Sequence, residues 1–299
     1  MKIILHELYN VQQANIIARP SKTCKTPYVA DAVLDGHIPS ASDIMVHTPS
    51  LGCCGLVEKG STIIVSTIHT TNKSRAEKLT CTHRAELACV YENNHLGIIG
   101  VNPALAECIA ETALIANCIR NLTLQTPYSY SKQTTLLSSR FDFSGICKDG
   151  SEFVLEIKNV PLADYVDVPK KERKKYAEYA NTKSYHEKIA YFPDGYRKSS
   201  GDVVSPRALK HIQELETIVK TTSKRAILCF VIQRPDADRF QPSVIDPTYR
   251  RAVQQAWNSG VEITTIQTRW THDGTCYFIR NDLPIHLFDT YGPQLPDHM

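Results

Sequence analysis

The 299 residues of this chain lack the features of membrane, secreted and repeat proteins. No apolar run approaches the roughly 18 residues that a transmembrane helix needs. The first five residues are followed at once by His6 and Glu7, so the apolar core of a signal peptide does not develop. There is no internal repeat and no low-complexity tract. We therefore expect a soluble, intracellular protein with no membrane partner.

The spacing of the ten cysteines indicates neither a disulfide framework nor a zinc knuckle. Most lie in apolar stretches, as Cys108 and Cys118 do, and this favours buried free thiols in a reducing compartment, the cytoplasm or the nucleus. Cys81, His83 and Cys89 come nearest to a zinc cluster, but no Cys-x-x-Cys pair accompanies them. We expect no zinc site.

The first hundred residues alternate short apolar runs with turn-forming residues. The runs that predict strands cover 28–34, 43–47, 61–67 and 86–91. Short strands at near-regular spacing, separated by Gly, Pro and Asn, are typical of a small barrel or sandwich. The length of the chain favours two domains, and we assign the first, an all-β domain, to residues 1–98.

The hydrophobic period changes after this point. Apolar residues recur every three or four positions over 103–122, and Asn102 followed by Pro103 supplies an N-cap and a first-turn proline. Further helices are expected over 206–219 and 249–257, and strands over 225–233 and 261–267. Alternating strands and helices predict a second, α/β domain over residues 99–299.

Two strand-like segments, 139–147 and 152–160, flank a Lys-Asp-Gly turn and predict a hairpin. Because side chains alternate along a strand, we expect Phe141 and Phe143 on one face and Asp142 on the other.

The same alternation applies to the second strand of the hairpin. It places Leu155 and Ile157 on one face and Glu156 and Lys158 on the other. Together with Asp142, three ionisable side chains are then expected on one face of the sheet. Two carboxylates can hold Mg²⁺ or Mn²⁺ beside a phosphodiester while a neighbouring lysine orients the attacking water. The pattern is the D…(D/E)-x-K signature of PD-(D/E)XK nucleases. An ordinary ion-paired hairpin is the alternative.

One short segment holds as much net charge as the whole chain. Residues 167–188 contain seven Lys and Arg against four Asp and Glu, a net +3 that equals the total formal charge. The basic residues that we predict to contact DNA phosphates are Lys170, Lys171, Arg173, Lys174 and Lys175. A solvated helix or loop is the alternative.

A set of motifs in fixed order resembles the sugar fermentation stimulation protein A family. The motifs are Val46-His-Thr-Pro49, Gly100-Val-Asn102, Arg140-Phe-Asp-Phe143, Glu156-Ile-Lys158-Asn-Val-Pro-Leu-Ala163, Ala190-Tyr-Phe-Pro-Asp194, Arg207-Ala-Leu-Lys-His211, Ala226 to Asp236, and Asp246-Pro-Thr-Tyr249. The resemblance spans nearly the whole chain. It implies an oligonucleotide-binding (OB) barrel followed by a PD-(D/E)XK domain, in a protein that binds DNA.

The resemblance also implies roles for individual residues. It assigns the active site to Asp142, Glu156 and Lys158, with Mg²⁺ or Mn²⁺ as the cofactor. A further metal ligand is expected from Glu107 on the preceding helix. The residues expected around this centre are Asp194, Arg207 and Gln233 as supporting groups, and Lys210 and His211 as DNA contacts.

The sequence departs from the family pattern in two places. Residues 50–52 read Ser-Leu-Gly where the family usually has Asn-Thr-Gly, which puts a polar contact there in doubt. Residues 165–189, which include the basic segment, resemble an insertion.

Two functions from different classes follow. The intact Asp142, Glu156 and Lys158 favour a metal-dependent DNA nuclease, because a pure binding protein has no need of a cation site among phosphates. The alternative is a regulatory protein that keeps the fold and binds DNA without cutting it. A sugar-metabolising enzyme is disfavoured, because neither a Rossmann glycine pattern nor a sugar-phosphate loop is present.

Overall fold

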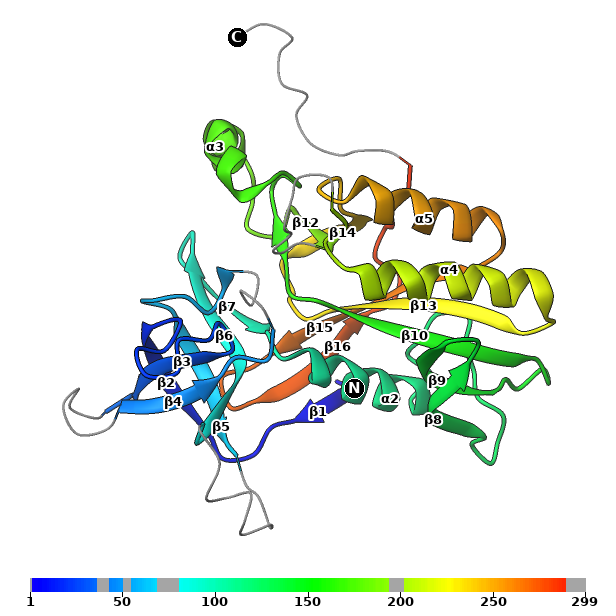
Figure 1. The fold of residues 1–299 in the computed structure, drawn as a ribbon, viewed down its shortest axis with the longest axis horizontal. Helices are drawn as coiled ribbons and strands as arrows, with labels where there is room; N and C mark the ends of the chain where they lie inside the picture. Colours follow the sequence, from blue (N-terminus) through cyan, green and yellow to red (C-terminus); the bar gives the residue numbers. More distant parts are fainter. Residues whose placement is uncertain (1, 37–42, 51–54, 69–80, 194–201, 289–299) are drawn as a thin grey trace, which may run out of the picture.

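The computed structural model describes residues 2–36, 43–50, 55–68, 81–193 and 202–288 (Figure 1). Within these residues the chain forms a β-barrel, a large mixed sheet flanked by helices, and a small third sheet. In Figure 1 the barrel lies at the left and the large sheet with its helices at the right.

The barrel is built from the first third of the chain. Its strands are β2 (Val11–Ala18), β3 (Val29–Leu34), β4 (Asp43–His47), β5 (Thr62–Thr67), β6 (His83–Glu92) and β7 (His95–Gly100), in the order β4-β3-β2-β5-β6-β7. Parallel pairing of β4 with β6 closes five of these strands into a barrel, and β7 extends β6 as a hairpin. Small and β-branched side chains such as Ala14, Val46 and Ile63 fill the interior. The predicted OB-like barrel is confirmed.

The large sheet carries the second unit. Its strands, in spatial order, are β1 (Ile4–Glu7), β16 (Thr275–Arg280), β15 (Glu262–Trp270), β13 (Arg225–Ile232), β10 (Glu152–Val160), β9 (Ser139–Ile146) and β8 (Tyr130–Leu136). The three central strands β10, β13 and β15 are parallel, and the other pairings are antiparallel. β13 is buried along almost its whole length, as its continuous apolar sequence predicts.

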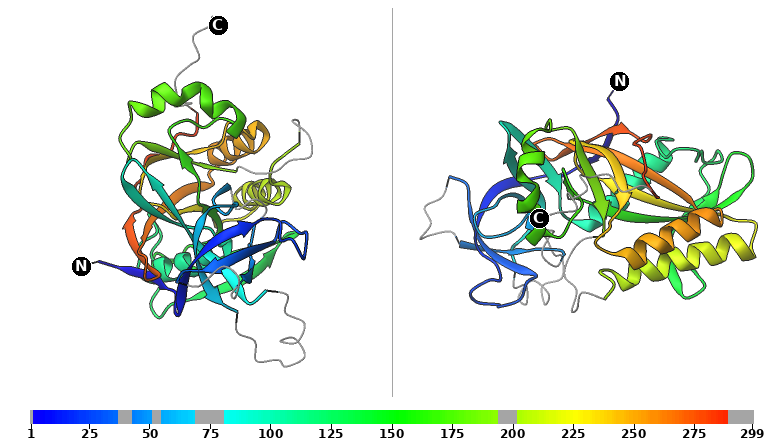
Figure 2. Two further views of the ribbon diagram at one scale, coloured as in Figure 1. Left: turned by 90° about the vertical axis from the view of Figure 1, so that its left-hand side faces the viewer. Right: turned by 90° about the horizontal axis from the view of Figure 1, so that it is seen from above.

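Helices cover both faces of this sheet. Helix α2 (Pro103–Ile115) packs in one core with Leu155 and Ile157. Helices α4 (Pro206–Thr221) and α5 (Pro247–Asn258) pack together on the opposite face, side by side in the right-hand view of Figure 2. This arrangement confirms the expected α/β architecture.

A third sheet of β11 (Ala163–Asp164), β12 (Lys188–Phe192) and β14 (Ala237–Pro242) lies near the carboxyl end of β10. Between β11 and β12 the chain forms a 3₁₀ helix, η2 (Lys170–Tyr176), and the short helix α3 (Ala177–Asn181). These two elements make up about half of the segment 165–189 that resembles an insertion.

The predicted end of the first helix and the predicted extent of the first domain, residues 1–98, differ from the structure. The helix expected over 103–122 ends at Ile115, because Asn117 adopts a left-handed conformation (φ 55°) and the Cys118 N–H bonds back to the Ala113 carbonyl at 2.7 Å. Strand β1 pairs with β16 in the large sheet rather than within the barrel. The division at residues 98 and 99 stays a prediction, although this first strand crosses it.

The expectation that Phe141 and Phe143 share a face is wrong. Phe143 lies in the core under α2, and Phe141 lies in the core under α4 and α5. The β9–β10 ladder ends at the Phe143–Leu155 pair, and beyond it the Asp142 carboxylate, not a backbone carbonyl, accepts the Ile157 N–H at 2.7 Å. The strands separate there and the alternation is broken.

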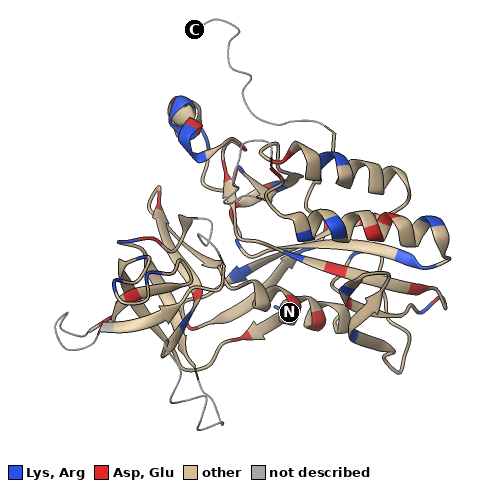
Figure 3. Cartoon of the chain, viewed as in Figure 1, with Lys and Arg blue, Asp and Glu red and all other residues tan. Residues whose placement is uncertain are grey.

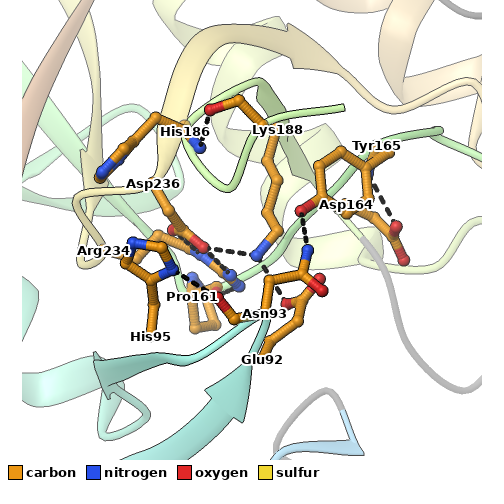
Figure 4. A network of polar contacts seen from close by, with 12 residues as sticks. Glu92, Asn93, His95, Pro161, Asp164, Tyr165, His186, Lys188, Arg234 and Asp236 are labelled. Carbon is orange, nitrogen blue, oxygen red and sulfur yellow. Dashed lines mark hydrogen bonds and ion pairs between the residues drawn. The ribbon is translucent and has the colours of Figure 1, made fainter. Parts of the chain in front are cut away.

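Buried polar contacts join the barrel to the second unit (Figure 4). Lys188 at the start of β12 donates to Glu92 at the end of β6 at 2.7 Å and to Asp236 at 2.8 Å. The His95 ring stacks on Tyr185 with centroids 4.5 Å apart. The β6–β7 turn is therefore docked on the segment between β11 and β12.

The eight described cysteines are free, and five of them are buried. Cys108, expected in the interior, is exposed, because it lies on the outer side of α2. In the described ranges no His, Cys, Asp and Glu side chains form a group of three or more arranged to hold a metal ion. Among those residues no helix has both the length and the apolar character to cross a membrane. The intracellular location stays a prediction.

Candidate functional site

A cavity of about 410 Å³ lies where β9 and β10 separate. It is bounded by the barrel through Ser50, by the start of α2, by the carboxyl half of β10, by the end of β12 and by the start of α4. Four residues predicted for the active site contribute to its lining: Glu107, Asp142, Glu156 and Lys158. The structure thus brings together side chains from one helix and two strands.

Glu156 is the most deeply buried of these groups, with 2% of its surface exposed. Its Oε1 accepts hydrogen bonds from Nδ1 of His211 on α4 and from Nζ of Lys158, two residues along the same strand. Its Oε2 is buried and has no hydrogen-bond partner among the described residues. Burial raises the pKa of Glu156, but the His211 and Lys158 interactions outweigh it, so the pKa lies below its ordinary value. Glu156 is therefore an anion.

Asp142 is buried next to this anion. One oxygen accepts the Ile157 backbone N–H, and the other lies 3.5 Å from Nε2 of Gln133 on β8. Burial and the charge of Glu156 raise the pKa of Asp142 to about 7. Two buried carboxyl groups repel each other when both are ionised, and this favours either a proton or a cation between them.

Glu107 reaches the cavity from α2. Asn102 caps this helix by accepting the Ala104 N–H at 3.1 Å, and Pro103 occupies its first turn, so the predicted helix start is confirmed. Gln133 donates to Glu107 at 2.9 Å and so connects it to the Asp142 side of the cavity. No sequence signal points to Gln133, because the surrounding strand β8 has no regular apolar alternation.

Arg207, Lys210 and Gln233, which the sequence predicts near the active site, differ from one another in exposure and in their hydrogen-bond partners. Arg207 lines the cavity and is exposed. Lys210, about one turn of α4 further along, donates to the Ser138 carbonyl at 3.0 Å. Buried Gln233 donates to Asn159 of β10 at 2.6 Å and accepts from the Trp270 indole N–H at 2.9 Å, so it supports the strand that carries Glu156 and Lys158.

The basic segment stands out from the body of the molecule and is largely blue in Figure 3. Lys170, Lys171, Lys174 and Lys175 are exposed. Arg173 instead pairs with Asp164 at 3.2 Å and donates to the Tyr191 hydroxyl at 2.5 Å. Because Tyr191 lines the cavity, Arg173 connects the basic segment to the wall of the site.

Two further points concern the predicted residues. Asp194 lies outside the described residues. Ser50 and Tyr191 also line the cavity. Tyr191 belongs to a motif that carries the family resemblance, whereas Ser50 belongs to residues 50–52, which depart from the family pattern. Lys170 approaches the barrel, since a Cβ atom on Gly55 would lie 3.3 Å from its Nζ.

Comparison with known proteins decides the family. The family model described as "Sugar fermentation stimulation protein RE domain" matches residues 104–274, more than half of the chain. The chain belongs to the sugar fermentation stimulation protein family. The matched range contains Glu107, Asp142, Glu156 and Lys158 together.

Relatives named sugar fermentation stimulation protein homolog extend the similarity into the barrel. The Nitrosococcus oceani protein is 26% identical over 266 residues, which is 87% of this chain and 92% of the relative. The Brucella ovis protein is 29% identical over 256 residues, covering 83% and 86% of the two chains. The Desulfotalea psychrophila protein is 28% identical over 211 residues, covering 70% and 71%.

A solved structure shares the fold. Pyrococcus furiosus SfsA, described as a complex with Ca²⁺, superimposes with a TM-score of 0.67 and covers 95% of this chain and 99% of its own, at 15% sequence identity. The barrel and the α/β unit of this family member therefore follow the architecture of that protein.

Proposed function

We propose that this protein is a DNA-binding, metal-dependent nuclease that hydrolyses phosphodiester bonds at the cavity between the barrel and the large sheet. The observation that carries the proposal is the pair of buried carboxyl groups, Asp142 and Glu156, at the separation of β9 and β10 with Lys158 alongside. Buried acidic groups with displaced pKa values in a cavity are typical of catalytic sites.

The donor set fits a hard divalent cation such as Mg²⁺ or Mn²⁺. Mg²⁺ is commonly held by one or two protein carboxylates, with water and substrate phosphate completing its shell. The unpartnered Oε2 of Glu156 and the raised pKa of Asp142 are the features that a cation would relieve. The solved structure of Pyrococcus furiosus SfsA in complex with Ca²⁺ supports the binding of a divalent cation.

The chain's own groups have separate tasks in this proposal. Asp142 and Glu156 hold the cation, which when bound neutralises charge on the phosphate and lowers the pKa of water. Lys158 supplies a positive charge and hydrogen-bond donors next to the reacting phosphate. Exposed Arg207, on the rim formed by α4, contacts a neighbouring phosphate.

DNA reaches the cavity along the surface that the barrel and the basic segment share. Lys170 lies against the barrel at Gly55, and Lys171, Lys174 and Lys175 are exposed beside it. Lysines on a projecting segment contact phosphates without reading base sequence. Binding is therefore expected to be salt-dependent and weakly selective for sequence.

One observation favours the non-catalytic alternative. The ammonium group of Lys158 at the cavity wall is engaged in an ion pair with Glu156, and the described residues include no group of three metal ligands. A protein that only binds DNA would tolerate such a closed arrangement.

Incubation of purified protein with linear, circular and single-stranded DNA, in Mg²⁺, Mn²⁺ or EDTA, tests the proposal. We expect cleavage in Mg²⁺ or Mn²⁺ and none in EDTA. Binding of all three DNA forms without any metal-dependent product would support the binding protein instead.

A further inference from the structure

We propose that His211 is a positioning residue, which holds one oxygen of Glu156 so that the other oxygen faces the cation. The inference rests on the proposed function of the same cavity and assigns His211 a role different from the DNA contact that the family resemblance implies.

His211 is fixed by the helix that carries it. Ser205 caps α4 by accepting the Ala208 N–H at 3.3 Å, and Pro206 occupies the first turn. About one and a half turns later, the His211 ring points into the core, where it packs against the Phe141 ring with centroids 5.8 Å apart. Only 4% of the surface of His211 is exposed.

The hydrogen bond between His211 and Glu156 has a fixed direction. A carboxylate only accepts hydrogen bonds, so Nδ1 of His211 carries the proton and donates, whether the ring is neutral or charged. The ring cannot turn away without leaving this donor buried among apolar side chains, which is unfavourable.

The two oxygens of Glu156 are not equivalent. His211 and Lys158 both donate to Oε1, whereas Oε2 is buried without a partner in the described structure. An unsatisfied buried carboxylate oxygen is costly, and a divalent cation satisfies it more strongly than any neutral donor. His211 thus selects which oxygen remains available and fixes the plane of the carboxylate.

A role in contacting DNA does not explain the buried position of His211. Its exposure of 4% leaves no surface for a phosphate, whereas Arg207 and Lys210 on the same helix are exposed. Removal of His211 is therefore expected to change cation binding while DNA binding in the absence of metal stays intact.

The test uses His211→Leu and His211→Asn in the full chain, with Gln213→Ala, an exposed change on the same helix, as the control. The Asn amide places a donor close to the position of Nδ1, and Leu removes it. Mn²⁺ binding is measured by calorimetry, DNA binding in EDTA by fluorescence anisotropy, and folding by circular dichroism and thermal melting.

We expect His211→Leu to weaken Mn²⁺ binding by about 10–100-fold, in line with other residues that orient metal ligands. His211→Asn is expected to recover most of this loss, and DNA affinity in EDTA is expected to stay within about twofold for both. If the Leu variant does not fold, the comparison of His211→Asn with His211→Gln keeps the test decisive, because the Gln amide lies nearer the position of Nε2. Equally tight Mn²⁺ binding by the Asn and Gln variants would overturn the positioning role.

Two other results also overturn the inference. One is wild-type Mn²⁺ affinity in a folded His211→Leu protein, and the other is lost DNA affinity in EDTA with unchanged Mn²⁺ affinity. Failure of the proposed function is distinguishable, because then the wild-type protein itself binds no Mn²⁺ and produces no cleavage.

Discussion

The ammonium group of Lys188 lies 2.7 Å from the carboxylate of Glu92, and this ion pair links the α/β unit to the barrel. Lys188 is 2% exposed and its Nζ also lies 4.2 Å from the centroid of the Tyr185 ring. Asp236 completes the neutralisation of the charge at 2.8 Å. The barrel is therefore held over the cavity by a buried polar network rather than by the connecting chain alone.

Lys188→Met is expected to destabilise the protein by about 1–3 kcal/mol, because it leaves the partly buried Glu92 without its cation and the buried Asp236 with Arg234 as its remaining partner. Denaturant unfolding followed by fluorescence measures the change. Lys183→Met, which breaks the partly exposed ion pair with Glu187 in the same segment, is the matched control and is expected to leave the unfolding midpoint nearly unchanged. Equal stability of the two variants would contradict the assigned role of Lys188.

The stability of the metal-free protein is expected to decrease as the pH rises from about 4 to about 7. The pKa of Asp142 is about 7 in the folded protein against 3.8 ordinarily, so the folded state binds the extra proton across this interval. Asp142→Asn removes the titration and should exceed the wild-type stability above pH 7 by up to about 4 kcal/mol. Melting in EDTA at pH 4 to 8 measures this.

The control for the Asp142 prediction is the cation. At pH 8, Mg²⁺ or Mn²⁺ should raise the melting temperature of the wild type and leave that of Asp142→Asn unchanged, because the cation replaces the proton as the partner of the carboxylate. Parallel pH profiles for the two proteins would show that Asp142 is not the titrating group.

Glu156→Ala is expected to abolish metal-dependent cleavage while DNA binding in EDTA stays unchanged or tightens, since a negative charge facing phosphate is removed. Glu156→Gln, which keeps the shape, should behave alike. Lys158→Ala should also stop cleavage but retain Mn²⁺ binding, with DNA affinity slightly reduced. Cleavage assays and calorimetry on the same preparations separate these effects, and unchanged cleavage in Glu156→Gln would exclude a ligand role.

Neutralising the exposed lysines of the basic segment is expected to weaken DNA binding and its salt dependence. Each lysine–phosphate interaction that is removed should lower the slope of log affinity against log salt by about one. The variant replaces Lys170, Lys171, Lys174 and Lys175 with Ala and retains Arg173, which is engaged by Asp164 and Tyr191. Fluorescence anisotropy over a salt series measures the slope.

A control variant that loses the same number of lysines elsewhere tests whether the position of the lysines affects DNA binding. It replaces Lys2, Lys148, Lys220 and Lys224, of which the last three lie at the end of the large sheet away from the cavity. We expect the control to keep the wild-type slope. If both variants show the same reduced slope, the basic segment contributes only general charge.

Local sequence patterns were sufficient to predict the start of α2 and the hairpin of β9 and β10, which carry the acidic residues of the candidate site. Asn102 and Pro103 defined the start of α2, and the Lys-Asp-Gly turn defined the hairpin, because capping and turn geometry depend on adjacent residues. The spacing of Glu156 and Lys158 on one strand likewise placed both on one side. The order of the family motifs added the barrel and the α/β unit, which the structure confirms.

The remaining features depend on contacts between residues that are distant in the chain. The strand β1 joins β16 from the opposite end of the sequence, and the separation of β9 from β10 sends Phe141 and Phe143 to different cores. Neither has a local signal, because strand partners and side-chain faces are set by what packs against them.

The polar partners of the site were decided in the same way. From the sequence, His211 and Arg173 were basic residues on surfaces open to DNA, whereas the folded chain turns His211 to Glu156 and Arg173 to Tyr191. Sequence thus determined which chemical groups the protein carries and the elements that hold them. Tertiary structure alone decided which groups face each other, because the burial and charge that set their pKa values and hydrogen bonds come from elements far apart in the chain.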